Sequence, residues 1–160
     1  MPAGQLLYHR AESLYKTGEH IYPGNWGRLV LGRGPAHGSF YREYLLEKIR
    51  ELEFPGKPSR LKASFAFVDR EFAEGWKRSE KAPFEYLYVV RIPDLTCQVH
   101  CADMSWIGTM MQYRSFAGVE KCARHYWNGD EKDPKQREVL VSGPLEVIER
   151  LTPLPEDKHN

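Results

Sequence analysis

The irregular order of helix-type and strand-type segments most constrains what this chain can fold into. Apolar residues recur at helical spacing over residues 39–52 and 118–127, while residues 60–68, 85–92, 138–142 and 145–151 are β-rich. A parallel α/β fold needs regular strand–helix–strand alternation, and these segments do not alternate in that way. We therefore expect an α+β domain with a split, largely antiparallel β-sheet core and flanking helices.

Local signals set the expected limits of these elements. Ser39 is a favourable N-cap for the first helix, and Asp69 is one for a short helix that reaches about Trp76. A short strand is expected over residues 6–9. Residues 18–27 are rich in turn formers and are expected to form a long loop of the kind that often carries function. The last two strands are expected to form a hairpin at residues 143–144.

The amount of apolar sequence supports one domain. Of 160 residues 41% are hydrophobic, so residues 1–152 are expected to form a single domain, followed by a flexible tail at 153–160. The net charge of +1 gives no strong field toward nucleic acid or an anionic membrane. Three cysteines, an odd number, indicate a reducing compartment. Without a signal-peptide pattern or an apolar run of ~18 residues, a cytoplasmic location is expected, in the producing or the targeted cell.

Common nucleotide, hydrolase and metal motifs are absent or weak. The chain has no Walker loop, no complete G-x-G-x-x-G and no G-x-S-x-G elbow. The spacing of Cys97, Cys101, Cys122 and His125 is loosely zinc-like. However, Cys97 and Cys101 fall on one face of a strand pattern and Cys122 on the apolar face of a helix, where a free cysteine acts as a small hydrophobe. We therefore expect no metal site.

Three separated segments are informative when they are taken together. They are Leu7-Tyr8-His9-Arg10, Ser64-Phe65-Ala66-Phe67 and Gln136-Arg137-Glu138 with the apolar strand that follows it. Together they resemble the ADP-ribosyltransferase superfamily, whose fold is shared by bacterial toxins such as diphtheria toxin and by poly-ADP-ribose polymerases. The first is similar to that family's NAD-binding strand end, the second to its nicotinamide-pocket strand, and the third to its Gln/Glu-x-Glu turn.

Four shorter segments resemble, more narrowly, a group of bacterial proteins of this fold. They are Ile21-Tyr22-Pro23-Gly24-Asn25-Trp26-Gly27-Arg28, Arg42-Glu43, Pro58-Ser59-Arg60-Leu61 and Tyr126-Trp127-Asn128-Gly129. The sequence also departs from the superfamily pattern. His9 is followed by Arg10 where many members have glycine, and the full Ser-Thr-Ser triplet is missing, so the histidine and arginine branches of the superfamily both stay open.

The resemblance implies an enzyme that transfers ADP-ribose from NAD to RNA or protein. It further implies a bacterial toxin or phage-defence effector, with an antitoxin or immunity protein as a further partner and no membrane partner. When nicotinamide leaves NAD, positive charge develops on the ribose, and a fixed carboxylate stabilises that charge. The implied catalytic residues are Glu138 and Gln136, and the implied NAD-binding residues are His9, Arg10, Trp26, Arg28, Arg60, Ser64, Phe65 and Tyr126.

Two expectations concern the acceptor. Residues two apart in an extended segment face the same side, so Gln136 and Glu138 are expected to share one cleft. Gln136 would then orient an incoming hydroxyl or amide rather than a guanidinium. An RNA acceptor is expected to contact local cations, namely Lys57, Arg60, Lys62, Lys132, Lys135 and Arg137.

Other interpretations stay open at this point. The same residues fit an NAD glycohydrolase with water as acceptor, an RNA 2′-phosphotransferase, which needs several arginines for phosphate, or a catalytically silent binding module. Taken singly, Glu138 also fits an exposed strand start, His9 a hydrogen-bonded interior or edge histidine, and Gln136 a solvated turn. Only the combination of these residues favours NAD chemistry.

Overall fold

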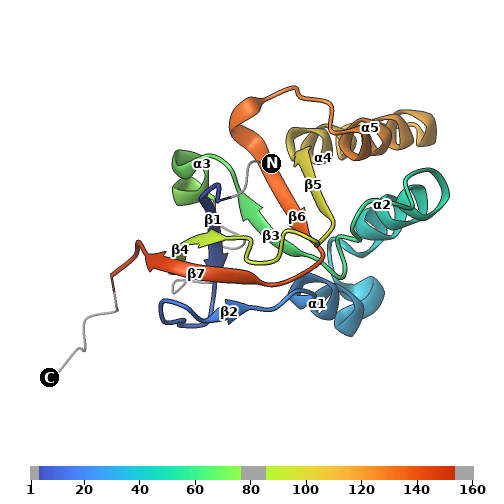
Figure 1. The fold of residues 1–160 in the computed structure, drawn as a ribbon. Coiled ribbons are helices and arrows are strands. Elements are labelled where there is room, and N and C mark those ends of the chain that lie inside the picture. The colour runs from blue at the N-terminus through green and yellow to red at the C-terminus, as the bar shows by residue number, and fades with distance from the viewer. Residues whose placement is uncertain (1–3, 77–85, 154–160) are drawn as a thin grey trace, which may run out of the picture.

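A computed structural model describes residues 4–76 and 86–153 of the chain (Figure 1). The expected α+β class is confirmed, because these residues form one antiparallel sheet of seven strands with five α-helices around it. The strands are β1 (Leu7–Ala11), β2 (His20–Ile21), β3 (Ser64–Phe67), β4 (Tyr86–Arg91), β5 (Val99–Asp103), β6 (Arg137–Val141) and β7 (Leu145–Arg150). The helices are α1 (Asn25–Arg33), α2 (Phe40–Glu53), α3 (Arg70–Gly75), α4 (Ser105–Met110) and α5 (Phe116–Asn128), with the 3₁₀ turns η1 (Gly34–Ala36) and η2 (Pro134–Gln136). Of the tail expected at 153–160, residues 154–160 lie outside the described residues.

The sheet consists of two halves that meet at one point. Its strand order is β2-β7-β4-β1-β3-β6-β5. Strand β1 pairs with β4 along its whole length, but it pairs with β3 only through Tyr8 and Phe67. The halves therefore diverge on either side of this pair, and Figure 1 shows β3, β5 and β6 running across the direction of β4 and β7.

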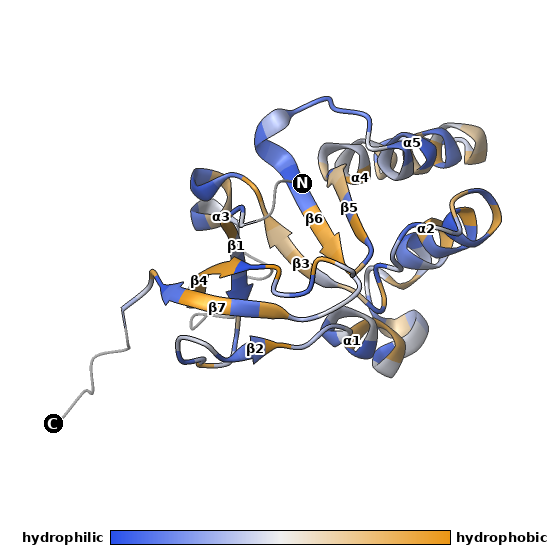
Figure 2. Cartoon of the chain, in the orientation of Figure 1, coloured by the Kyte–Doolittle hydropathy of each residue, from blue (hydrophilic) through white to orange (hydrophobic). Residues whose placement is uncertain are grey.

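Side chains from both halves meet in an inner cluster. Val90 of β4, Val147 of β7 and Val139 of β6 belong to it, and each is at most 1% exposed. Burial of such a side chain stabilises the fold by about 1.5–3 kcal/mol. Figure 2 shows that the strands in this central region are among the most hydrophobic parts of the chain.

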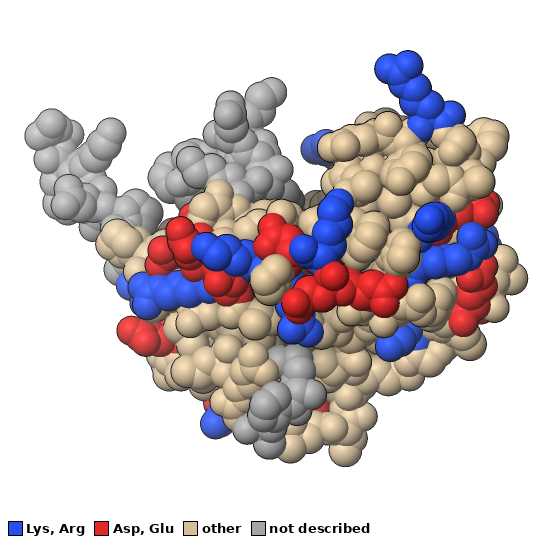
Figure 3. Space-filling view, turned by 90° about the horizontal axis from the view of Figure 1, so that it is seen from above, with Lys and Arg blue, Asp and Glu red and all other residues tan. Residues whose placement is uncertain are grey.

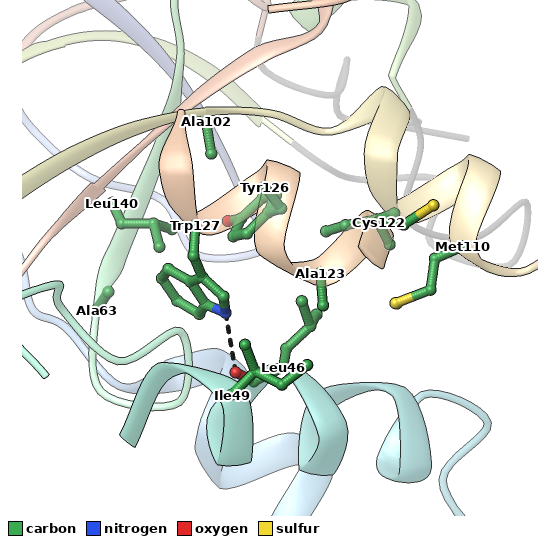
Figure 4. Packing of buried hydrophobic residues seen from close by; sticks show 11 residues of the cluster. Leu46, Ile49, Ala63, Ala102, Met110, Cys122, Ala123, Tyr126, Trp127 and Leu140 are labelled. Carbon is green, nitrogen blue, oxygen red and sulfur yellow. Dashed lines mark hydrogen bonds between the residues drawn. The ribbon is translucent and has the colours of Figure 1, made fainter. Parts of the chain in front are cut away.

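The opposite, outer face of the sheet is covered by helices. Helices α2, α4 and α5 pack on the half that contains β5 and β6, where the buried Trp127 donates its Nε1–H to the Leu46 carbonyl at 2.9 Å (Figure 4). Leu140 of β6 lies in the same cluster. Helix α3 packs against Phe67 and Leu87. The outer face is thus divided between a three-helix layer and the short helix α3.

The two long helices begin and end for local reasons. The buried Leu46 and Ile49 give α2 its apolar face, although Ser39 makes no side-chain capping bond at its N-cap. In α5, Ser115 accepts a hydrogen bond from the Gly118 amide at 3.1 Å. Gly129, at φ 76°, ends this helix in the left-handed conformation that favours glycine. Both helices were expected, and α5 begins two residues earlier than its pattern predicts.

Three expectations about the fold are wrong. Residues 18–27 are not all loop, because α1 begins at Asn25, and a Cβ on its Gly27 would lie 1.9 Å from the Leu61 carbonyl oxygen. This glycine serves close packing rather than a turn. Residues 60–62 form a turn and β3 begins only at Ser64, so the strand expected over 60–68 is shorter. Strands β6 and β7 form no hairpin, since β6 pairs with β3 and β5 and β7 with β2 and β4.

Candidate active site

Glu138 lies near the start of β6, in the middle of one half of the sheet. It is opposite Phe67 of β3 and Ala102 of β5. Directly opposed residues of antiparallel strands point to the same face, so Glu138 lies on the outer face, beneath the helices. Its side chain is almost fully buried. The alternative of an exposed strand start is therefore excluded.

Arg60 is the charged partner of Glu138. It lies in the turn before β3 and is 5% exposed. Its Nη1 donates to Glu138 Oε1, and its Nε and Nη2 donate to the carboxylate of Glu43 in α2 at 2.9 and 3.2 Å. A buried charge is tolerated when it is paired in this way. Because the Arg60 guanidinium is buried and committed to these partners, the expectation that it binds an NAD diphosphate or an RNA phosphate is corrected.

Tyr126 supplies the third member of this network from α5. Its hydroxyl donates to Glu138 Oε1 at 2.6 Å and accepts a hydrogen bond from Arg60 Nη1 at 2.5 Å. The residue is fully buried, and its ring packs edge-on against Trp127. No ring face is left for nicotinamide, so the expected stacking role of Tyr126 is corrected to a hydrogen-bonding one.

The two carboxylates of the network are held differently. Both oxygens of Glu43 are occupied, since Oε1 accepts from Arg42 and Arg60 and Oε2 accepts from Arg60. In Glu138, both bonds from described residues end on Oε1. Its Oε2 receives none from the described part of the chain, and a carboxylate oxygen has lone pairs for a further donor or a nearby positive charge. Within residues 4–76 and 86–153, both oxygens of Glu43 therefore have partners, whereas Glu138 is bonded through Oε1.

Burial and charge act against each other on the ionisable groups of the network. Burial raises the pKa of Glu43, but Arg60 and Arg42 outweigh it and hold that pKa below its ordinary value. Burial lowers the pKa of Arg60, but Glu138 and Glu43 raise it well above its ordinary value. Burial also raises the pKa of Tyr126 well above its ordinary value. At neutral pH, Arg60 is therefore charged, Glu43 is ionised and the Tyr126 hydroxyl keeps its proton.

The shorter segments noted in the sequence converge on this network. Arg60, Glu43 and Tyr126 each come from one of them, and Trp26 comes from a fourth. Trp26 Nε1 lies close enough to Glu43 to help lower its pKa, although it makes no hydrogen bond of ordinary geometry. The ring of Phe65 lies 5.1 Å from the Arg60 guanidinium. Trp26 and Phe65, expected to bind nicotinamide, thus lie against the network instead.

His9 and Arg10 lie on opposite faces of the sheet. Tyr8 is opposite Phe67, which is opposite Glu138, so Tyr8 and Arg10 share the outer face with Glu138 and His9 points to the inner side. The Nδ1 of His9 lies 2.5 Å from the Phe65 carbonyl oxygen. This placement corrects the expectation that His9 and Glu138 bind one ligand together.

Arg10, Ser64 and Arg28 also have protein partners. Arg10 donates to the carbonyl oxygens of Ala73 and Glu74 at 2.6 and 2.5 Å and so holds the C-terminal end of α3. Ser64 is buried and donates to the Gly143 carbonyl at 2.8 Å. Arg28 is exposed and pairs with Asn25 within α1. Ser64 is therefore structural, because its hydroxyl joins β3 to the turn after β6.

Gln136 does not share a cleft with Glu138 in the expected way. It belongs to η2 rather than to β6, so the alternation of an extended segment does not apply to it. Its Nε2 donates to Asp133 Oδ2 at 2.8 Å. The side chain therefore stabilises its own turn. Of the two interpretations of Gln136, this geometry is closer to a turn residue than to a residue that orients an acceptor.

The cations expected to contact RNA are dispersed. Lys132 donates to Thr109 and lies over the Trp106 ring at 5.1 Å. Lys135 pairs with Glu71 and Arg137 with Glu131. Figure 3 shows basic and acidic side chains interspersed over one face of the molecule, without a broad field of one sign there. That face provides no electrostatic surface for a polyanion.

An open hollow lies on the outer side, between α3 and η2. It is lined by Phe72, Trp76, Gly75, Glu71 and Lys135. Phe72 and Trp76 pack with Phe67, the residue directly opposite Glu138, and Arg10 is bonded to the same helix. The hollow thus combines aromatic surface with a cation beside the Glu138 face. The sequence analysis missed it, although Trp76 was identified as a helix end.

Neither a metal centre nor a membrane segment emerges from the described residues. No group of three or more His, Cys, Asp or Glu side chains within 4–76 and 86–153 is placed to hold a metal ion. Cys97 and Cys101 pack against the inner cluster, and Cys122 of α5 is buried among the apolar side chains of the outer-face helices. No helix in that part of the chain is both long and apolar enough to cross a membrane.

A comparison with protein families adds one match. Residues 30–153 match a family described as "Protein of unknown function (DUF2441)". The match covers most of the chain and includes Glu43, Arg60, Tyr126 and Glu138, whereas β1 with His9 and Arg10 lies before it. No match was found among curated proteins.

Proposed function

We propose that this chain, which belongs to the DUF2441 family, is an NAD-dependent ADP-ribosyltransferase that modifies a macromolecule, RNA or protein, as a bacterial toxin or phage-defence effector. One observation carries the proposal. Glu138 is a carboxylate that the described residues hold through one oxygen, on the face of the split sheet that it shares with Arg10. The resemblance of the Gln136-Arg137-Glu138 segment to a superfamily motif supports the same role for Glu138.

The reaction needs little from the protein beyond this carboxylate and a binding surface. The bond between the nicotinamide nitrogen and ribose C1′ breaks, and its electron pair leaves with nicotinamide. Positive charge then develops at C1′, and the Glu138 carboxylate stabilises it at close range in a site of low dielectric. An oxygen or nitrogen of the acceptor forms the new bond to C1′ and loses its proton to solvent.

NAD would occupy the hollow between α3 and η2. The rings of Phe72 and Trp76 provide apolar surface for the nicotinamide or the adenine. Lys135 is exposed and paired only with an exposed glutamate among the described residues, so it is available to the diphosphate. Arg10 would fix α3, and therefore the hollow, relative to Glu138.

A second candidate is an NAD glycohydrolase, and the position of Gln136 favours it. This amide, expected to orient the acceptor, is bonded to Asp133 within its own turn. Water needs no such orienting group. An RNA 2′-phosphotransferase is less well supported, because Arg60 is buried and Arg10 and Arg28 bond to protein groups.

The test is incubation of the purified chain with NAD labelled in its adenylate half, together with separate pools of RNA, DNA and protein. Released nicotinamide reports cleavage, and label in one pool identifies the acceptor. Glu138→Gln is compared with Glu149→Gln, an exposed glutamate of β7. Transfer that is lost only in Glu138→Gln supports the proposal. Free ADP-ribose as the sole labelled product shows the glycohydrolase, and absence of cleavage with every pool overturns both and leaves a binding module.

A further inference from the structure

Glu138 is held by two donors that come from different parts of the chain. Arg60 precedes β3 and Tyr126 lies in the last turn of α5, and both donate to Oε1. Two bonds to one oxygen restrict rotation of the carboxyl group, and neither of them uses the other oxygen. Preorganisation of this kind lowers a barrier because the charged group need not reorient during the reaction.

Arg60 is itself held from a third direction. Its Nε and Nη2 donate to the two oxygens of Glu43, so α2 fixes the plane of the guanidinium. One buried guanidinium thus serves two buried carboxylates. Every charge transferred into the interior costs several kcal/mol, and buried ion groups can often be replaced by apolar side chains of similar volume without loss of stability. Stability alone therefore does not explain why this region holds two carboxylates.

We propose that Arg60 and Tyr126 are positioning residues that orient Glu138 for the cleavage of NAD, and that Glu43 sets how strongly Arg60 engages it. The inference rests on the proposed function, since it assigns roles around the same carboxylate. In the proposed reaction Glu138 is the carboxylate that acts on the ribose, whereas Arg60, Tyr126 and Glu43 act through Glu138. Other described groups also face these four residues. Arg42 contacts Glu43, the His100 ring of β5 packs edge-on against the Tyr126 ring, and the Cys101 thiol of β5 interacts electrostatically with Glu138.

The test compares variants that disturb Glu138 in opposite directions. Tyr126→Phe removes one donor and keeps the ring, so it should lower kcat by about 10-fold, leave KM for NAD within about 2-fold and move the acidic limb of the kcat profile to higher pH. Glu43→Gln frees Arg60 to bind Glu138 alone, so it should move the same limb to lower pH. Damage to the fold would not shift the limb in opposite directions.

Tyr88→Phe is the matched control. Tyr88 is also fully buried, but its hydroxyl bonds to Tyr15 and Ser13, away from Glu138. It should leave kcat and the pH profile unchanged. If the wild-type chain does not cleave NAD, the proposed function itself fails. If the wild type cleaves NAD and both network variants keep its kcat and its acidic limb, only the positioning role is overturned.

Discussion

The two faces of β6 carry different kinds of side chain, apolar on one and charged on the other. On the inner face, Val139 and Val141 are fully buried against apolar side chains from both halves of the sheet. On the outer face, Glu138 meets Arg60, which in turn bonds Glu43. One strand therefore has one face that contributes packing and another that holds buried charge.

This difference between the two faces supports the outer face as the location of the proposed site. The inner face provides the stability expected from apolar burial and needs no further explanation. Buried charges on the outer face contribute little net stability relative to apolar residues of the same volume. Departures from local rules of this kind are expected at functional sites.

The largest expected effect on stability comes from removing Arg60, the shared partner on the charged face. Arg60→Ala leaves two buried carboxylates without their shared partner, so the free energy of unfolding at pH 7 should fall by about 3–5 kcal/mol, measured by urea titration. Arg91→Ala is the control, because Arg91 forms an exposed pair with Glu146 and its loss should cost less than about 1 kcal/mol. Equal costs for the two variants would show that the buried carboxylates do not depend on Arg60 for their stabilisation.

The next effect concerns pH and His100, which lies buried beneath α5 on the outer face and stacks on Trp127. Burial lowers its pKa from 6.5 to about 4. As pH falls, the unfolded chain takes up the proton first, so stability is complete above pH 6.5 and declines toward pH 4, by up to about 3 kcal/mol. His100→Gln should flatten this decline between pH 6.5 and 5, while His20→Gln, at an exposed histidine, should not. A decline that survives in His100→Gln contradicts the assignment.

Adjacent residues on the two faces give the sharpest comparison. Glu138→Gln should lower NAD turnover by about 10²-fold with little change in stability, because an amide cannot offset the developing charge. Val139→Ala should lower the free energy of unfolding by about 1.5–3 kcal/mol and leave turnover of the folded enzyme unchanged. Unfolding titrations and nicotinamide release measure both quantities. Parallel loss of both properties in each variant would remove the distinction between the faces.

The smallest effect is expected at Gln136. Its amide bonds Asp133 within η2, so Gln136→Ala should cost less than about 1 kcal/mol and change NAD cleavage and transfer by less than about 3-fold. Product analysis with labelled NAD measures both activities. Selective loss of transfer with cleavage intact would instead restore the acceptor-orienting role first expected from the sequence.

Local patterns were sufficient for much of the fold. The helical spacing around Leu46 and Ile49 predicted α2, and Asp69 marked the start of α3, where its side chain accepts from the Phe72 amide at 2.7 Å. Helix α1 was missed because Gly24 and Gly27 are typical of turns. The need for Gly27 arises from its contact with Leu61, and no local pattern reveals such a long-range approach.

Part of the candidate site could also be predicted from local sequence. Glu138 was identified because it belongs to a contiguous segment, Gln136-Arg137-Glu138, that is followed directly by an apolar strand. The burial of Arg60 could not be derived, because its partners Glu43 and Tyr126 are brought to it only by the packing of α2 and α5 on the sheet. The opposite facing of His9 and Glu138 depends on strand register, which the sequence does not fix when the order of strands is unknown.

The sharing of Arg60 between two carboxylates has an evolutionary consequence. Loss of Arg60 alone leaves two buried carboxylates unpaired, and loss of Glu43 alone changes how Arg60 bonds to Glu138. Either single substitution therefore lowers stability or the proposed activity. Joint replacement by apolar residues of similar size carries no such penalty. In a lineage that abandons the chemistry, we therefore expect Glu43, Arg60 and Glu138 to disappear together while the valines on the inner face persist. Covariation of these three positions among relatives would then show which of them have kept the proposed chemistry.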